Sequence, residues 1–350
     1  MFLAWERRPA DAKFEDVRDP TPSPLYPETQ VGRDAWIVAH RPDLDRQRAA
    51  LSVDRPSGQL IEDEPDAQGS RVRTLTVFLT NRECPWRCLM CDLWKHTTHE
   101  TVPVGAIPRQ IDVATRSVSG EFGQIKLYNA GSFFDPRAIP PEDHAAIAGR
   151  CHGFRSVVVE SHPTLIGPKV PVFRERLDGS RLEVAIGLES AESSLLDRLN
   201  KRMTRDDFAR AAGYLSEHGI GVRVFLLVKP PFVDDAAALD QASRSVQFAF
   251  ASGADVVSLI PTRPGNGALD RLARAGLFTP PTLTLFEDSV DAAFAFRPPG
   301  GRIFADLWDL ERFCDDPGSL DARAARMAAM NLGQQVLPRI GAAVSARHRP

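Results

Sequence analysis

The sequence predicts an α/β fold: a partial (β/α)6 barrel of the TIM type, with an irregular N-terminal arm and a mainly helical C-terminal extension. Three observations predict it. Six short apolar runs recur between residues 75 and 260, helical patterns separate them, and a chain of 350 residues, 43% of them hydrophobic, can bury a sizeable core. Six β–α units, where a closed barrel has eight, indicate an open barrel whose functional end lies at the C-terminal ends of its strands.

Residues 1–70 are expected to form an N-terminal extension. Five prolines lie within residues 1–30, and the apolar residues there show little periodicity, which is typical of an irregular arm. Farther along, residues 43–51 are expected to form a short helix and residues 61–69 an acidic loop.

Residues 71–265 are expected to form the core of the fold. The apolar runs are four to seven residues long and hydrophobic on both faces, as in parallel strands covered on both sides. They span residues 75–80, 125–129, 157–160, 182–188, 222–228 and 256–260. Strands in this order, separated by helices, predict a parallel sheet with right-handed crossovers.

The clearest helix between these runs covers residues 204–218. Thr204 is placed to cap it, and Asp207 follows three residues later, as in a capping box. Residues 141–151 and 235–250 show a similar helical pattern.

Residues 266–350 are expected to form a helical cap. Helical patterns cover residues 267–275, 284–295 and 321–334, and the Pro-Pro-Gly-Gly segment at 298–301 interrupts them.

The charge balance excludes several classes of protein. With 43 basic and 46 acidic residues the net charge is −3, which disfavours indiscriminate nucleic-acid binding but leaves a local basic groove open. No apolar stretch approaches the roughly 18–20 residues of a membrane span, and the start of the chain lacks an apolar run long enough for a signal peptide. We therefore expect a soluble, cytoplasmic protein with no membrane partner.

The cysteines point to a metal site. Of the five, Cys84, Cys88 and Cys91 form a C-x3-C-x2-C pattern directly after the first core strand, which is a poor disulfide framework and a good metal framework. Three thiolates in one loop fit a [4Fe–4S] cluster with one iron left open to a small molecule. Structural zinc with His96 or His99 as the fourth ligand is the alternative. A ferredoxin-like electron carrier is disfavoured, because it needs a fourth cysteine nearby.

These motifs resemble the radical SAM superfamily, and more closely its branch related to the radical half of the elongator catalytic subunit and to the radical SAM partner of archaeosine synthase. The resemblance covers residues 71–335. The segments that carry it are residues 83–92, 126–136, 158–163, 184–190, 199–204 and 227–232, with 304–310 and 330–332 farther along.

The resemblance implies a reaction and its cofactors. The open iron of a [4Fe–4S] cluster held by the three cysteines would chelate S-adenosyl-L-methionine, one electron would cleave its S–C5′ bond, and a 5′-deoxyadenosyl radical would abstract hydrogen from a substrate. The implied partners are a one-electron donor of the flavodoxin or ferredoxin type and a substrate, with a modified nucleoside in tRNA as the leading choice. The alternatives are a radical SAM enzyme acting on a small molecule or peptide, and a non-catalytic zinc-binding adaptor protein.

Polar residues at the ends of the predicted strands are candidates for S-adenosylmethionine binding. Asn129, Gly131 and Ser132 follow the second core strand, where glycine allows close backbone approach and serine offers a hydroxyl; a simple turn is the alternative. Glu160 and Glu189 end the third and fourth strands, where a carboxylate is costly unless it is paired or bound. For Glu189, an ion pair with a neighbouring lysine or arginine is the alternative.

Three basic residues and a methionine complete the candidate set. Lys201 and Arg202 could pair the methionine carboxylate, and Lys229 ends the fifth strand at the mouth of the barrel. A solvated surface pair and a snorkelling side chain are the respective alternatives. Met90 precedes the third cysteine, where the superfamily often has an aromatic residue that packs on adenine, and its thioether could serve instead.

Overall fold

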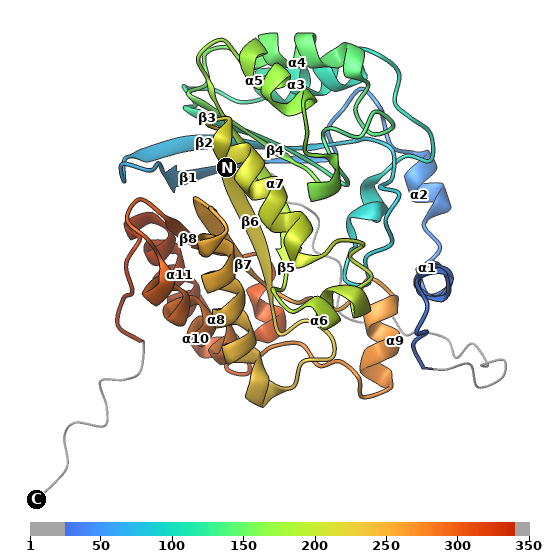
Figure 1. The fold of residues 1–350 in the computed structure, drawn as a ribbon, viewed down its shortest axis with the longest axis vertical. Helices are drawn as coiled ribbons and strands as arrows, with labels where there is room; N and C mark the ends of the chain where they lie inside the picture. Colours follow the sequence, from blue (N-terminus) through green and yellow to red (C-terminus); the bar gives the residue numbers. More distant parts are fainter. Residues whose placement is uncertain (1–24, 340–350) are drawn as a thin grey trace, which may run out of the picture.

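The computed structural model describes residues 25–339, which form a curled sheet covered by helices (Figure 1). Within these residues the strand order is β1-β2-β3-β4-β5-β6-β7-β8. Strand β1 pairs antiparallel with β2, and every later neighbouring pair is parallel. The predicted partial barrel is therefore confirmed. Residues 1–24 of the predicted arm lie outside the described residues.

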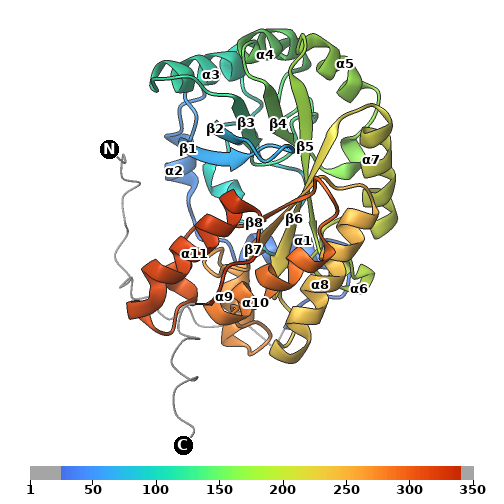
Figure 2. The ribbon, with the colours of Figure 1, turned by 90° about the vertical axis from the view of Figure 1, so that its left-hand side faces the viewer.

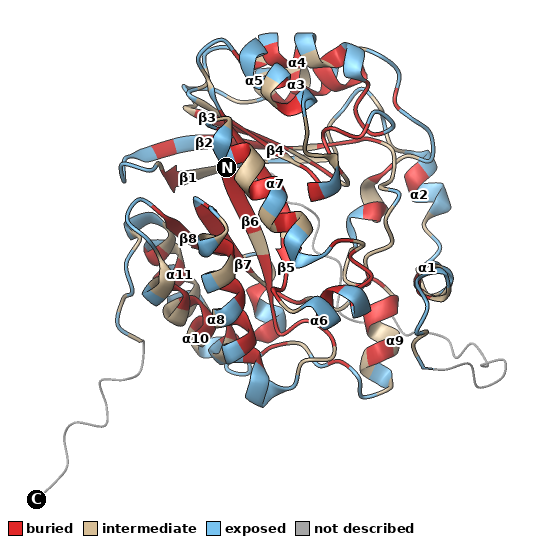
Figure 3. Cartoon of the chain, in the orientation of Figure 1, coloured by how far each residue is buried: buried red, intermediate tan, exposed pale blue. Residues whose placement is uncertain are grey.

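The six predicted core strands are all present. They are β2 (Arg71–Leu79), β3 (Gln124–Asn129), β4 (Ser156–Glu160), β5 (Arg181–Glu189), β6 (Gly221–Val228) and β7 (Val256–Pro261). Their central residues are buried on both faces, as Figure 3 shows in red. A parallel strand buried on both sides has a continuous apolar sequence, which is why the pattern alone located these strands.

The acidic loop predicted for residues 61–69 is wrong, because strand β1 (Gly58–Pro65) occupies most of it. Its acidic side chains are accommodated by buried basic partners. Lys126 Nζ lies 2.8 Å from Glu62 Oε1, and Arg223 Nη2 lies 2.9 Å from Glu64 Oε2. Burial alone would raise the pKa of Glu64, but the charges of Arg223 and Lys126 outweigh it and lower the pKa to about 2.

A second strand departs from expectation near the C-terminus. Residues 266–350 were expected to form a helical cap, but β8 (Arg302–Ala305) adds to the sheet beside β7. Arg302 at its start is held by Glu183, with 3.1 Å between Nη2 and Oε2. The strand has four residues and begins with arginine, so its sequence carries little strand pattern.

Helices cover the outer face of the sheet (Figures 1 and 2). They are α3 (Ala106–Arg116), α4 (His144–Cys151), α5 (Lys169–Arg176), α7 (Arg205–Glu217) and α8 (Asp235–Ala251). The capping box predicted for α7 is present, because Thr204 Oγ1 accepts from the Asp207 N–H and Asp207 Oδ2 accepts from the Thr204 N–H.

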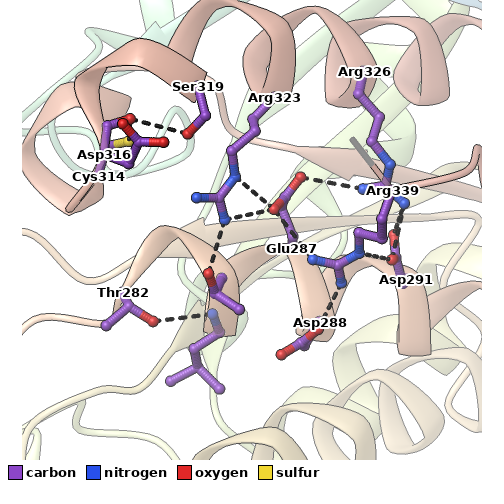
Figure 4. Close-up of polar contacts among 12 residues, drawn as sticks. Thr282, Glu287, Asp288, Asp291, Cys314, Asp316, Ser319, Arg323, Arg326 and Arg339 are labelled. Atoms are coloured by element: carbon purple, nitrogen blue, oxygen red, sulfur yellow. Dashed lines mark hydrogen bonds and ion pairs between the residues drawn. The ribbon is translucent and has the colours of Figure 1, made fainter. Parts of the chain in front are cut away.

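The predicted C-terminal helices are also present. They are α9 (Ala268–Arg274), α10 (Leu283–Ala293) and α11 (Leu320–Gly333). Figure 4 shows α10 and α11 joined by ion pairs around Glu287, whose Oε2 lies 2.6 Å from Arg323 Nη2 and 3.1 Å from Arg339 Nη1. In the same region the Cys314 thiol donates to the Asp316 carbonyl at 3.1 Å.

The remaining elements are short. Helices α1 (Gln30–Ala39), α2 (Asp45–Ala49) and α6 (Ser193–Arg198) lie on the side of the molecule where α9 is found (Figure 1), and α2 is the short helix expected at residues 43–51. The 3-10 turns are η1 (Leu93–His96), η2 (Pro141–Asp143), η3 (Pro163–Leu165), η4 (Phe294–Phe296), η5 (Leu310–Phe313) and η6 (Pro317–Ser319). In the described part of the chain, no helix has both the length and the apolar character needed to cross a membrane.

Candidate functional site

The three clustered cysteines lie in a long loop, residues 80–98, that follows the C-terminal end of β2; we call it the cysteine loop. Its two ends are tied together. The Glu83 N–H donates to the Thr98 carbonyl at 3.1 Å, and the Thr98 N–H donates to the Asn81 carbonyl at 2.9 Å. The loop is therefore closed at its base, beside the C-terminal end of β2.

The thiols of the loop lie near one another, and all three cysteines are half-buried. Burial, as the larger cause, and the charge of Cys88 raise the pKa of Cys84 and of Cys91, the latter to about 12. The Cys91 N–H also donates to the Cys88 carbonyl at 3.2 Å. Among residues 25–339, however, no three His, Cys, Asp or Glu side chains are arranged as a group that could hold a metal ion. The structure thus shows the donor set but not a finished ligand geometry.

Asparagine side chains hold the backbone of the cysteine loop in place. Asn200 Nδ2 donates to the Arg87 carbonyl and Asn266 Nδ2 to the Leu89 carbonyl, both at 2.7 Å. The Leu89 N–H donates to the Leu199 carbonyl at 2.9 Å. Sequence reasoning did not select Asn266; the signal that could have found it is an asparagine between two glycines just after β7, at the mouth of the barrel.

Asn129, at the end of β3, carries a buried amide whose Oδ1 and Nδ2 have no hydrogen-bond partner among residues 25–339. Two unpaired polar atoms in a side chain that is 4% exposed are costly, so they mark a place where a ligand would supply the bonds. Gly131 lies beside them with φ +153°. A Cβ on Gly131 would lie 3.5 Å from Cys84 Cβ and 3.7 Å from Asn129 Nδ2. The glycine therefore keeps open a space between the amide and the cysteine loop.

Glu160 joins this group from the end of β4. Its Oε2 accepts from the Asn129 N–H at 2.9 Å. Burial raises the pKa of Glu160 to about 8, and the nearby charges of Lys201 and Glu189 also affect it. Glu160 therefore lies near Asn129 and near the charged residues Glu189 and Lys201.

Glu189 and Lys201 form a buried ion pair, with 2.7 Å between Oε1 and Nζ. This is the pairing named above as the alternative for Glu189. Burial alone would lower the pKa of Lys201, but the charge of Glu189 outweighs it and raises the pKa. Both residues also influence the pKa of Cys88, which burial raises, so the pair borders the cysteine loop.

Backbone strain gathers at the same end of the barrel. Eight non-glycine residues in the described chain have positive φ, and five of them follow or end β5 and β6. These five are Glu189, Asn200, Arg202, Lys229 and Phe232. Such conformations persist only where the surrounding structure imposes them, and they concentrate at functional sites.

The Ser132 hydroxyl forms a hydrogen bond within the protein. Its Oγ accepts from the His162 N–H at 2.8 Å. The His162 ring stacks on Trp86 of the cysteine loop with centroids 4.0 Å apart, and its Nε2 lies 3.1 Å from the Lys201 carbonyl. Burial, as the main cause, lowers the pKa of His162 to about 4, so the ring is neutral and suited to this packing.

Three candidates point to other partners. Arg202 pairs with Asp34 of α1, Lys229 Nζ contacts Asp235 and donates to Thr279 Oγ1 at 2.7 Å, and Met90 packs in a small hydrophobic cluster with Leu89 and Leu199. Asn129, Gly131, Glu160, Glu189 and Lys201 therefore lie beside the cysteine loop. The side chains of Ser132, Arg202, Lys229 and Met90 have partners of their own.

The chemistry of the donors in the cysteine loop, though not their present arrangement, suits an iron–sulfur cluster. The donors are thiols, as such clusters require. The unpartnered Asn129 amide and the space kept by Gly131 lie next to Cys84. For the zinc alternative, His99 is half-exposed, with its Nε2 3.6 Å from Asp45 Oδ1, so this ring is turned to an acidic partner.

Comparisons with known proteins agree with the motifs. No family model matches the chain. The archaeosine synthase subunit beta of Methanosarcina acetivorans is 28% identical over 242 residues, which cover 66% of this chain and 69% of that protein. The archaeosine synthase subunit beta of Thermococcus kodakarensis is 28% identical over 166 residues, 45% of this chain and 51% of that protein.

Solved structures show weaker similarity. Methylornithine synthase (PylB) aligns with a TM-score of 0.48 at 14% identity, over 87% of this chain and 77% of that one. The archaeal Elp3 of Methanocaldococcus infernus aligns with a TM-score of 0.45 at 14% identity, over 64% of this chain and 58% of that one. Both scores are below 0.5, so neither alignment carries an argument about this chain. The similarity in sequence is to proteins named archaeosine synthase subunit beta, which agrees with the branch that the motifs resemble.

Proposed function

We propose that this protein is a radical SAM enzyme that binds a [4Fe–4S] cluster through Cys84, Cys88 and Cys91 and S-adenosylmethionine beside it. The observation that carries the proposal is the unpartnered, buried Asn129 amide next to a loop with three thiols. When bound, the cluster would supply the electron for reductive cleavage of S-adenosylmethionine, which leads to hydrogen abstraction from a substrate. Residues 71–265 form the catalytic core in this proposal.

The protein's own residues would bind and orient the cofactor. The Asn129 amide offers one acceptor and two donors to the amino-acid end of the ligand. The Lys201 ammonium has three donors, more than its bond to Glu189 uses, so it can also pair with a carboxylate. Glu160 and Glu189 can accept from ribose hydroxyls or from an ammonium group. We assign no cofactor contact to Arg202 or Lys229, which are paired elsewhere.

We propose a nucleoside in tRNA as the substrate, with a small molecule or peptide as the alternative. The support comes from the relatives, which are named for archaeosine synthase and are called a subunit. The proposal therefore includes a partner subunit and a one-electron donor of the flavodoxin or ferredoxin type. It also includes a cytoplasmic location, where free thiols stay reduced.

Anaerobic reconstitution with iron and sulfide tests the cofactor proposal. We expect a brown protein with about four irons per chain, and 5′-deoxyadenosine after addition of S-adenosylmethionine and dithionite. A colourless protein that takes up one zinc per chain and forms no 5′-deoxyadenosine would support the adaptor alternative and contradict the proposal.

Binding to bulk tRNA tests the substrate class separately. A nucleic-acid substrate predicts binding that weakens as salt is raised, because phosphate contacts release counterions. If 5′-deoxyadenosine forms but tRNA does not bind at low salt, the cofactor proposal stands and the substrate is a small molecule or peptide.

A further inference from the structure

We propose that helices α1 and α2, with the segment between them, form a clasp that positions the cysteine loop through Glu83. This inference rests on the proposed function, since it concerns how the loop keeps its metal centre. The clasp comprises residues 30–49. Arg41 and Arg48 of the clasp are its positioning residues, and Glu83 directly precedes Cys84.

Both carboxylate oxygens of Glu83 form ion pairs with arginines of the clasp. Arg41 Nη1 lies 2.7 Å from Oε1, and Arg48 Nη2 lies 2.9 Å from Oε2. Arg87, within the cysteine loop, adds a contact of 3.2 Å to Oε1. The side chains of Arg41, Arg48 and Glu83 are only 10%, 7% and 14% exposed. Charge-assisted bonds that are shielded from water in this way are stronger than surface ion pairs.

The clasp also reaches the far end of the cysteine loop. Arg48 Nε donates to the Thr97 carbonyl at 3.0 Å, and its Nη2 donates to Thr97 Oγ1 at 3.1 Å. The Arg41 guanidinium lies over the Trp94 ring, 4.5 Å from its centroid. Arg48 therefore connects residues on both sides of the three cysteines, and Arg41 covers the segment just after them.

A second set of contacts fixes the clasp to the barrel. Asn200 Nδ2 donates both to Asp34 Oδ1 of α1 and to the Arg87 carbonyl, each at 2.7 Å. At the start of α9, Gly267 has φ +87°, and a Cβ there would lie 1.9 Å from the His40 carbonyl oxygen at the end of α1. The glycine is thus required for the close contact between α9 and the clasp. Figure 1 shows α1 and α9 on the same side of the molecule.

These contacts give the clasp a function beyond covering the barrel. The clasp forms hydrogen bonds with Glu83, the residue before Cys84, and with Thr97, the residue after η1. It also bonds Asn200, which itself donates to the loop backbone. A loop with three ligands keeps a metal centre only while its backbone stays ordered. We expect the clasp to slow the release of iron.

The rate of iron transfer to excess chelator, measured on the reconstituted full chain under anaerobic conditions, tests the inference. The double variant Arg41→Gln/Arg48→Gln should release iron at least about tenfold faster than wild type, as expected for the loss of charge-assisted hydrogen bonds. Arg41→Lys/Arg48→Lys keeps the charge and should recover part of the difference. Arg323→Gln, which removes a similarly shielded ion pair on α11, should release iron at the wild-type rate.

A second measurement does not depend on the metal. Hydrogen exchange of the apo chain should be faster in the double variant at the amides of Glu83, Leu89 and Thr98, and unchanged in Arg323→Gln. If the double variant does not fold, Glu83→Gln removes the same charge contacts and should show both effects.

The outcomes separate the two proposals. Wild-type protein that takes up no iron contradicts the proposed function, and hydrogen exchange then decides on the clasp alone. Wild-type protein that holds iron while the double variant releases it at the same rate, with unchanged exchange, overturns the clasp and leaves the proposed function intact.

Discussion

Glu189 at the end of β5 and Lys201 before α7 form an ion pair of 2.7 Å in which each side chain is only 11% exposed. The pair joins two segments that both show left-handed backbone conformations, at Glu189 itself and at Asn200 and Arg202 around the lysine. It lies beside the cysteine loop, because both charges influence the pKa of Cys88. Mutation can separate the structural role of this pair from its proposed role in cofactor binding.

Removal of one partner of this pair should destabilise the protein more than removal of both. Glu189→Gln or Lys201→Met alone leaves a buried charge uncompensated and should lower the free energy of unfolding by about 3–5 kcal/mol. The double variant should recover most of this loss, while S-adenosylmethionine binding to reconstituted protein stays weak in all three. Urea unfolding and cofactor titration measure the two effects. A double variant as unstable as the sum of the single variants would contradict the pairing.

Replacement of Asn129 by leucine should separate stability from binding. The amide has two buried unpartnered atoms, so Asn129→Leu should leave the free energy of unfolding unchanged or raise it by about 1 kcal/mol. Cofactor affinity should fall by about tenfold or more, with iron content unchanged. The control is Asn331→Leu, because the Asn331 amide bonds the N–H and carbonyl of Ala305 at 2.8 and 2.9 Å, and its loss should cost about 1–3 kcal/mol. A destabilised Asn129→Leu with normal affinity would make Asn129 structural.

Glu160 should give the protein a measurable pH dependence. Burial, the main cause, raises its pKa from 4.5 to about 8. Between these two pH values the folded state therefore keeps a proton on Glu160 that the unfolded state has lost. The contribution of Glu160 is fully favourable below pH 4.5 and is lost as the pH rises toward 8, because the unfolded state then binds fewer protons. Relative to wild type, Glu160→Gln should flatten the fall in the melting temperature between pH 5 and 8.

The control for this measurement is the same change at exposed Glu100, which should give the wild-type pH profile. Melting curves of the apo protein at several pH values suffice. A Glu160→Gln profile parallel to that of wild type would show that Glu160 is ionised in the folded protein near neutral pH.

The three clustered cysteines should be individually necessary for iron binding, and Cys314 should not. Each of the variants Cys84→Ala, Cys88→Ala and Cys91→Ala should have an iron content after reconstitution far below the wild-type value of about four per chain. Each should also form no 5′-deoxyadenosine. Cys314→Ala should retain both, since this thiol donates to the Asp316 carbonyl in the C-terminal region (Figure 4). Retained turnover in any of the first three variants would contradict the ligand assignment.

Several features were accessible from the sequence because they depend on local chemistry. Parallel strands buried on both faces need continuous apolar runs, so the six core strands could be located without coordinates. The capping box of α7 needs only Thr204 at the N-cap and Asp207 three residues later. The spacing of Cys84, Cys88 and Cys91 likewise places three thiols in one loop whatever the rest of the chain does.

Other features depend on partners that are distant in the sequence. Strand β1 was missed because Glu62 and Glu64 look like loop residues until Lys126 and Arg223 are placed against them. In the site, the sequence identified Glu189 and Lys201 as candidates. The ion pair of Arg202 with Asp34 became clear only from the structure, because it depends on the position of α1. Asn266 and Glu83 were missed because their partners are backbone atoms or arginines far away along the chain.

The sequence by itself determined the six core strands, three of the helices between them and the thiol-bearing loop, because periodicity and spacing act over a few residues. Only the tertiary structure decided which polar side chains turn toward that loop and which are held elsewhere. A charged or amide group settles where its hydrogen bonds can be completed, and that depends on what the whole fold brings within about 3 Å of it.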